Sequence, residues 1–168
     1  MSATTLKVRP LTREAFAPFG DVIEVAGARS FPINDDTCIR YDNLARIDVA
    51  EQMGHASLSV FRGQPVRFPM QISEVERHPL GSQSFTPMGE FAFLIVVAAN
   101  GAQGNPGEPY AFLSNGRQGV NYARGTWHHP LLSLGQVSDF LVVDRVGPGA
   151  NCDVAALPAR YSIESASL

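Results

Sequence analysis

The chain has 168 residues, of which 45% are hydrophobic and 17% charged, and its formal net charge is −3 at pH 7. This composition predicts a single globular domain over residues 1–168, and it excludes wholesale disorder. The small negative charge excludes a broad basic surface for nucleic acid or an anionic membrane, and no apolar run approaches the ~20 residues of a membrane-spanning helix.

Short extended stretches separated by turn residues make up most of the chain. Near the start, Thr12 is a candidate N-cap for one helical turn, which Pro18 and Gly20 end. Residues 48–53 fit either a helical turn or a bent strand. Strands are predicted where apolar residues alternate with polar ones or follow one another, at residues 6–9, 21–25, 39–42, 57–62, 91–98, 110–113 and 138–145.

Two later stretches are predicted to lack regular structure. Residues 100–109 are rich in glycine and proline, which predicts a mobile or inserted loop. Residues 153–157 are expected to form a short turn, after which the tail frays.

Many short strands, turns of Gly, Pro and Asn, and very little helix predict a mainly β fold. The expected architecture is an antiparallel barrel or sandwich with a few short helical turns. The strand at residues 91–98 is apolar on both faces. Such a strand is covered on both sides, by the barrel interior and by either a second sheet or another subunit, and it therefore points to a dimer.

Cys38 and Cys152 are the only cysteines, and they have no metal-binding or redox spacing. We expect two buried thiols in a reducing cytoplasm, with a disulfide between them as the open alternative. The N-terminus lacks the basic flank and apolar run of a secretory signal, so the expected location is the cytoplasm.

The first polar segment, residues 76–88, brings a carboxylate, an imidazole and an amide together. Glu76 and His78 are two residues apart, so on a strand their side chains share a face. Pairing across a hairpin at Gly81 would bring Gln83 to the same face. This set suits proton transfer or weak metal coordination. The alternative is a polar surface hairpin in which His78 merely precedes a proline turn.

The second polar segment, residues 119–130, holds two of the four histidines and the only tryptophan. His128 and His129 are adjacent, so in an extended chain only one of them can point into a barrel. Pro130 favours an extended conformation at His129. We expect His128 to point inward and His129 to hydrogen-bond to a neighbouring strand or across an interface.

The two polar segments resemble degenerate cupin motifs. Residues 123–128, Ala-Arg-Gly-Thr-Trp-His, resemble the second motif, Pro-x-Gly-x-x-His, with Ala for Pro. The first motif is His-x-His followed by Glu, and here Glu76 stands for the first His and Gln83 for the Glu. The resemblance implies a cupin-like barrel or jelly roll.

A longer resemblance runs nearly end to end, to the ureidoglycolate lyase family of allantoin degradation, long known as ureidoglycolate hydrolases. It implies a homodimer that cleaves (S)-ureidoglycolate to glyoxylate and urea, and nickel or another divalent ion has been linked to the family. The matching blocks lie, in order, at residues 10–23, 33–34, 40–41, 76–88, 115–122, 127–131, 139–141 and 144–154.

The implied reaction suggests roles for the polar residues. Ureidoglycolate is the carbinolamine of glyoxylate and urea, so its cleavage needs a base for the hydroxyl proton and an acid for the departing nitrogen. We expect His128 and His78 to be the base and acid, with Glu76 tuning or sharing the base role. No covalent nucleophile is needed.

The remaining expected site residues bind the substrate or an ion. Gln83 and Asn34 would hydrogen-bond the ureido group, and either Arg62 or Arg124 would hold the carboxylate. If a divalent ion such as Ni²⁺ is bound, its ligands would be Glu76, His78, Gln83 and His128. Gln83 is neutral and a weaker ligand than Glu, so only weak binding is expected.

Three rival functions remain open from the sequence. A hydrolase acting on the same substrate would release ammonia rather than urea. A metal-dependent cupin dioxygenase or isomerase would require a firmly bound metal. A non-catalytic cupin sensor would bind a small acid without turnover.

Overall fold

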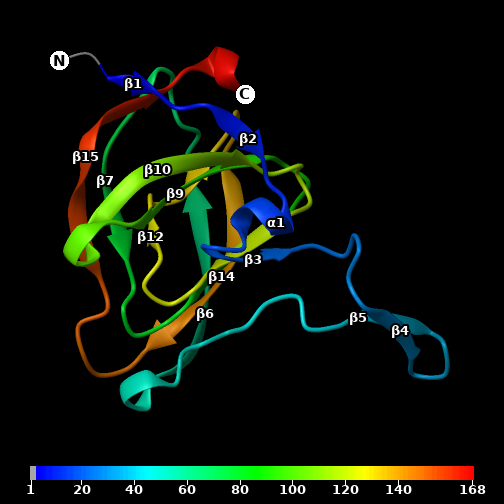
Figure 1. Ribbon diagram of the computed structural model, residues 1–168. Helices are drawn as coiled ribbons and strands as arrows, with labels where there is room; N and C mark the ends of the chain where they lie inside the picture. Colours follow the sequence, from blue (N-terminus) through cyan, green and yellow to red (C-terminus); the bar gives the residue numbers. More distant parts are fainter. Residues whose placement is uncertain (1–2) are drawn as a thin grey trace.

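Two curled sheets wrap around an apolar interior and form a half-barrel, which is a cupin-like β fold (Figure 1). The computed structural model describes residues 3–168. The eight-stranded sheet has the order β1-β15-β7-β12-β9-β10-β2, with β13 also paired to β9. Its strands are β1 (Thr4–Thr5), β2 (Val8–Pro10), β7 (Met70–Arg77), β9 (Phe93–Asn100), β10 (Pro106–Leu113), β12 (Trp127–His128), β13 (Leu132–Ser133) and β15 (Asp153–Ile163).

The five-stranded sheet has the order β3-β11-β8-β14-β6. Its strands are β3 (Gly20–Ile23), β6 (His55–Gly63), β8 (Gln83–Pro87), β11 (Gly119–Tyr122) and β14 (Ser138–Val146). The predicted helical turn is confirmed as α1 (Arg13–Phe16), because the Thr12 hydroxyl accepts a hydrogen bond from the Ala15 amide, 3.2 Å away. The undecided stretch at 48–53 ends in a 3₁₀ turn, η1 (Glu51–Met53).

Strand β9 separates two apolar cores. Phe93, Ile95 and Val97 point into the core between the two sheets, where they meet residues of β8, β11, β14 and α1. The alternate side chains of the same strand point into a second core, against β7 and β15. Both faces of this strand are thus covered by its own chain, so its apolar sequence no longer argues for a second subunit.

The two stretches predicted to be irregular are largely strands. Strand β10 begins at Pro106, within the predicted loop, after a short turn η2 (Ala102–Gly104). The tail does not fray after residue 157, because it forms β15, whose pairing with β7 shifts register between Ala156 and Tyr161. That irregularity accommodates Pro158, which cannot donate to a ladder, and the buried Tyr161 and Ile163 hold the strand down.

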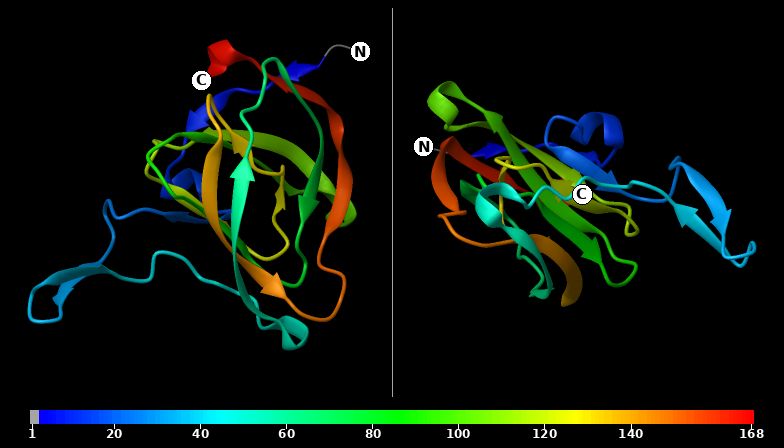
Figure 2. Two further views of the ribbon diagram at one scale, coloured as in Figure 1. Left: turned by 180° about the vertical axis from the view of Figure 1, so that it is seen from behind. Right: turned by 90° about the horizontal axis from the view of Figure 1, so that it is seen from below.

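A two-stranded hairpin stands away from the half-barrel (Figures 1 and 2). It consists of β4 (Ser30–Ile33) and β5 (Cys38–Tyr41), which among the described residues pair only with each other. We refer to residues 30–41 as the arm. Its tip is a turn in which Asn34, Asp35 and Asp36 all have left-handed backbone angles, which Asn and Asp tolerate better than most residues.

The prediction of buried thiols is wrong. Cys38 lies on the arm and Cys152 precedes β15, and both are exposed free cysteines. Within residues 3–168, none of the helices is long and apolar enough to cross a membrane.

Candidate active site

Both polar segments cross from one sheet to the other, side by side. The first leads from β7 in the eight-stranded sheet to β8 in the five-stranded sheet, and the second leads back from β11 to β12. The predicted hairpin at Gly81 is therefore wrong, because β7 and β8 lie in different sheets. Gln83 reaches the site because the chain changes sheets, not because it pairs with Glu76.

Strand register then places the polar side chains together. His128 of β12 lies opposite Glu76 of β7, and Tyr122 of β11 lies opposite Gln83 of β8. Residues directly opposite in an antiparallel pair project from the same face. The sequence prediction that Glu76 and His128 meet inside the fold is thus met by the geometry, and His128 is the histidine that points inward, with 1% of its surface exposed.

Glu76, His78 and His128 form what we term the acid–histidine cluster. Glu76 Oε1 lies 3.6 Å from His128 Nε2 and 4.0 Å from His78 Nε2. The two imidazole rings are 5.2 Å apart between centroids. One oxygen or nitrogen atom from each of the three residues lies within 4.8 Å of the others. A single small group can therefore contact all three side chains.

Backbone carbonyls set the tautomer of both histidines. His78 Nδ1 lies 2.6 Å from the Asn151 carbonyl oxygen, and His128 Nδ1 lies 2.9 Å from that of Thr126. Because a carbonyl oxygen only accepts, each Nδ1 carries its proton and each Nε2 faces the cluster. His128 Nε2 is buried and has no hydrogen-bond partner among residues 3–168. A buried polar atom without a partner is costly, which marks the position where a ligand would bind.

Gln83 links the cluster to an acidic side chain behind it. Its Oε1 lies 3.2 Å from His78 Nε2, and its Nε2 lies 3.5 Å from Asp144 Oδ2. The contact with His78 is satisfied by a proton on that nitrogen, by a cation, or by turning the amide so that its NH₂ group faces the ring. In each case the hydrogen bonding of the Gln83 amide depends on the proton or ion present at the cluster.

The electrostatics keep Glu76 ionised at neutral pH. The contact with His128 lowers the pKa of the Glu76 carboxyl below its ordinary value, while partial burial acts in the opposite direction. Burial lowers the pKa of His129, whose Nδ1 lies 3.0 Å from the Pro130 carbonyl oxygen. The main-chain amide of His129 also donates to Val96 on β9, at 2.8 Å, as expected for a residue beside a neighbouring strand.

Tyr122 is a site residue for which the sequence analysis assigned no role. Its ring stacks on His128 with centroids 4.1 Å apart and planes inclined by 14°. Burial, followed by the charge of Glu76, raises the pKa of its hydroxyl, which is therefore neutral. Asn151 was also given no role, because nothing in the local pattern predicts that its carbonyl binds a histidine 73 residues away in sequence.

A cavity of about 370 Å³ opens beside the cluster. Arg62 contributes to its wall and forms a two-pronged ion pair with Asp139, at 2.7 and 2.8 Å. The cavity is lined by Phe61, Arg62, Gly63, Glu76, Gln83, Phe85, Pro130 and Leu131. Its size suits a small carboxylic acid.

The other two predicted substrate ligands lie elsewhere. Arg124 does not line this cavity and instead pairs with Glu51, at 2.7 Å. Asn34 is exposed at the tip of the arm, so the structure does not bring it to the cluster of its own chain.

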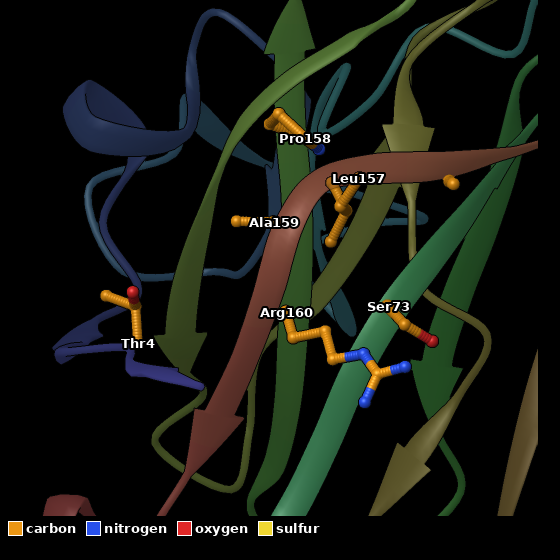
Figure 3. A pocket seen from close by; sticks show the side chains of 7 residues that line it. Thr4, Ser73, Leu157, Pro158, Ala159 and Arg160 are labelled. Atoms are coloured by element: carbon orange, nitrogen blue, oxygen red, sulfur yellow. The ribbon is translucent and has the colours of Figure 1, made fainter. Parts of the chain in front are cut away.

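A larger cavity lies at the irregular part of β15 but offers little chemistry (Figure 3). Its volume is about 610 Å³, and Arg160 is the only charged residue in its lining. The side chains around it are otherwise small or apolar, apart from Thr4 and Ser73. The acid–histidine cluster is therefore the better candidate for catalysis.

Comparisons with known proteins match nearly the whole chain to one family. The family model described as ureidoglycolate lyase matches residues 3–164. A ureidoglycolate lyase of Burkholderia mallei is 52% identical over 154 residues, 92% of this chain and 90% of the relative. The enzyme of the same name from Pseudomonas aeruginosa is 54% identical over 149 residues, covering 89% and 88%. That from Burkholderia cepacia is 52% identical over 165 residues, covering 98% and 93%.

Proposed function

The chain belongs to the ureidoglycolate lyase family, and from that premise we propose that it cleaves (S)-ureidoglycolate to glyoxylate and urea. The observation that carries the proposal is the convergence of Glu76, His78 and His128 beside a cavity sized for a small acid. The activity fits a single catalytic domain in the breakdown of allantoin.

The reaction balances with two proton transfers and no covalent intermediate on the enzyme. A base removes the proton of the substrate hydroxyl, its oxygen becomes the aldehyde of glyoxylate, and the carbon–nitrogen bond breaks. An acid returns a proton to the departing nitrogen, which leaves as urea. Each positioned proton transfer contributes roughly 10²–10⁴-fold to the rate.

His128 is suited to act as the base. Its Nδ1–H is committed to the Thr126 carbonyl, so the Nε2 lone pair faces the cluster and is not occupied by another protein group. After His128 takes the hydroxyl proton, the ionised Glu76 carboxylate, 3.6 Å away, stabilises the resulting imidazolium. Glu76 thus tunes the base and can share its role.

His78 is suited to act as the acid. Its Nε2 lies beside the Gln83 amide oxygen, an acceptor that stabilises a proton on that nitrogen. The Asn151 carbonyl holds the opposite side of the ring, so the imidazole presents Nε2 in one orientation. Gln83 can also hydrogen-bond the ureido group, since it lines the cavity.

Arg62 is the arginine placed to hold the substrate carboxylate, because it lines the cavity. It is also exposed and engaged with Asp139, so it would share its guanidinium between two carboxylates. The sequence left Arg62 and Arg124 as alternatives, and their positions favour Arg62.

The cluster also fits a weakly held divalent ion such as Ni²⁺. His78 and His128 each donate Nδ1–H to a carbonyl and present Nε2, the arrangement found in metal-binding histidines. The Nε2 atoms of His78 and His128 and the Glu76 carboxylate would hold the ion, with the Gln83 oxygen as a weaker ligand. In that state His128 could not act as the base, because its Nε2 lone pair would bind the ion. When bound, such an ion would polarise the hydroxyl and carboxylate oxygens of the substrate.

Product analysis tests the reaction. With purified protein and (S)-ureidoglycolate, we expect urea and glyoxylate in equal amounts. Ammonia as the first nitrogen product would overturn the lyase assignment in favour of a hydrolase.

Metal binding has a separate test that does not depend on turnover. Added Ni²⁺ should raise the thermal midpoint of the chelator-treated wild type, because an ion that binds only the folded state stabilises it. The His128→Ala variant should lose this shift. An unchanged midpoint in the wild type would remove the metal from the proposal.

We also propose that the protein is a cytoplasmic homodimer. Two exposed free thiols fit a reducing compartment better than an oxidising one. A second copy would cover the arm, whose strands pair with no other strand among residues 3–168.

A further inference from the structure

The arm exposes apolar side chains, and it pairs with no other strand in the part of the chain that the structure describes. In its register Pro32 faces Ile39 and Ser30 faces Tyr41, so these four residues share one side. Ile39 is 51% exposed and Tyr41 is 43% exposed. An isolated two-stranded hairpin is at best marginally stable in water. The arm therefore requires an apolar surface that its own half-barrel does not supply.

The outer face of the five-stranded sheet supplies such a surface. On β6, Ser59 and Phe61 pair with the fully buried Val142 and Phe140, so Leu58 and Val60 point outward. Leu58 is 66% exposed and Val60 is 55% exposed. Across β14 they lie opposite Val143 and Leu141, which extend the apolar strip. Adjacent exposed apolar residues of this kind mark an interaction surface.

The arm and this strip match in their order of apolar and charged groups. Along one edge, the arm carries Tyr41 and Ile39 and then the acidic tip at Asp35 and Asp36. Strand β6 carries Leu58 and Val60, and then come Arg62 and, just beyond the strand, Arg67. Neither Asp35 and Asp36 nor Arg67 forms an ion pair among the described residues, whereas Arg62 already pairs with Asp139. Laid along one another, the two surfaces place apolar against apolar and acidic against basic.

A symmetric pair of chains uses each surface twice. In a twofold dimer the same patch operates on both copies, so two arms would cover two strips. The arm together with the exposed parts of β6 and β14 amounts to about 20 residues per protomer, the size of a standard stable interface. The figures show the arm projecting clear of the barrel, where a second copy can reach it (Figure 2).

We propose that the arm of each protomer packs on the outer face of the partner's five-stranded sheet, with Ile39 against Val60 and the acidic tip beside Arg62 and Arg67. This arrangement rests on the homodimer proposed above and defines its interface. Because Arg62 also lines the cavity, the tip, including Asn34, would lie at the mouth of the partner's active site. Asn34 would then serve the neighbouring subunit and not its own.

Sedimentation of charge variants tests the interface. The wild type should sediment as a dimer, and Ile39→Asp and Leu58→Asp should each weaken dimerisation by roughly a hundredfold, because each buries a charge without a partner. Val154→Asp is the matched control, since Val154 is 62% exposed on β15 in the other sheet, and it should remain a dimer. If Ile39→Asp and Leu58→Asp both sediment as dimers like the wild type, the proposal is overturned.

A cross-link tests the contact without destabilising the fold. In a Cys38→Ser, Cys152→Ser background, Ile39→Cys combined with Val60→Cys should give a covalent dimer on oxidation, and Ile39→Cys combined with Val154→Cys should not. Absence of the first product would overturn the arm placement even if the protein is a dimer. A monomeric wild type would overturn the homodimer as well, whereas urea release tests the reaction independently.

Discussion

The acid–histidine cluster and the arm depart from the ordinary distribution of side chains in opposite directions. The cluster buries an imidazole nitrogen without a partner, next to an ionised carboxylate. The arm exposes Ile39 and Tyr41 to solvent on a hairpin that, among residues 3–168, pairs with no other strand. Neither choice favours the stability of an isolated chain. Proteins accept such exceptions where they bind something, which supports the proposals of a small acid at the cluster and of a second copy at the arm.

Removing the groups of the cluster that move or stabilise the transferred proton should have the largest effect. We expect Glu76→Ala and His128→Ala each to lower kcat by roughly 10²–10⁴-fold, because each removes a group that moves or stabilises the transferred proton. Urea release measures the loss, and circular dichroism verifies the fold. Glu74→Ala is the matched control, since Glu74 is an exposed carboxylate on the same strand. Near-normal turnover in Glu76→Ala or His128→Ala would remove that residue from the mechanism.

The attachment of the 3₁₀ turn η1, which follows the arm in the chain, to the barrel provides the next test. Arg145 is 6% exposed and donates hydrogen bonds to the carbonyls of Glu51, Gln52 and Pro148. We expect Arg145→Ala to lower the free energy of unfolding by about 2–3 kcal/mol, because it removes the charge-assisted hydrogen bonds that the buried Arg145 guanidinium donates. Urea denaturation measures this. Arg145→Lys should be destabilised less than Arg145→Ala, because the ammonium can keep some of these hydrogen bonds but cannot reproduce the forked geometry of the guanidinium. An unchanged denaturation midpoint in Arg145→Ala would show that these hydrogen bonds do not stabilise the fold.

Tyr122 tests whether the cluster depends on packing as well as charge. The ring stacks on His128, and an aromatic pair contributes ~1 kcal/mol beyond its buried area, which corresponds to roughly fivefold in rate if the whole contribution is lost from the transition state. We expect Tyr122→Leu to lower kcat by about that factor with KM little changed, and Tyr122→Phe to retain activity. If Tyr122→Phe is as impaired as Tyr122→Leu, then the hydroxyl and not the stacking is required.

Arg62 should give the smallest change, and one confined to binding. We expect Arg62→Ala to raise KM by several-fold with kcat nearly unchanged, the signature of lost uniform binding. Arg124→Ala, which removes an arginine outside the cavity, should leave KM unchanged. Within one protomer the Arg62–Asp139 and Arg124–Glu51 pairs are both exposed, so the loss of either pair should cost the folded protomer little stability. If Arg124→Ala raised KM and Arg62→Ala did not, Arg124 would be the arginine that binds the substrate carboxylate.

Local chemistry predicted a large part of this molecule. The N-cap at Thr12, the alternating strands and the concentration of polar groups in two segments all follow from short-range patterns. Local pattern failed at residues 153–163, where it predicted a short turn followed by a frayed tail but burial of Tyr161 and Ile163 maintains a strand. Tertiary burial outweighs a local breaker when the ladder can absorb it as an irregularity.

The amino-acid sequence by itself determined which functional groups are present and that Glu76, His78 and His128 belong together by their spacing and family pattern. Only the tertiary structure decided how they meet, through two crossings between sheets and a register that sets His128 opposite Glu76. It also decided that Asn151 orients His78 and that Asn34 lies on the arm. The physical reason is that side-chain periodicity is local, whereas strand partners and sheet membership are set by burial among residues far apart in the chain.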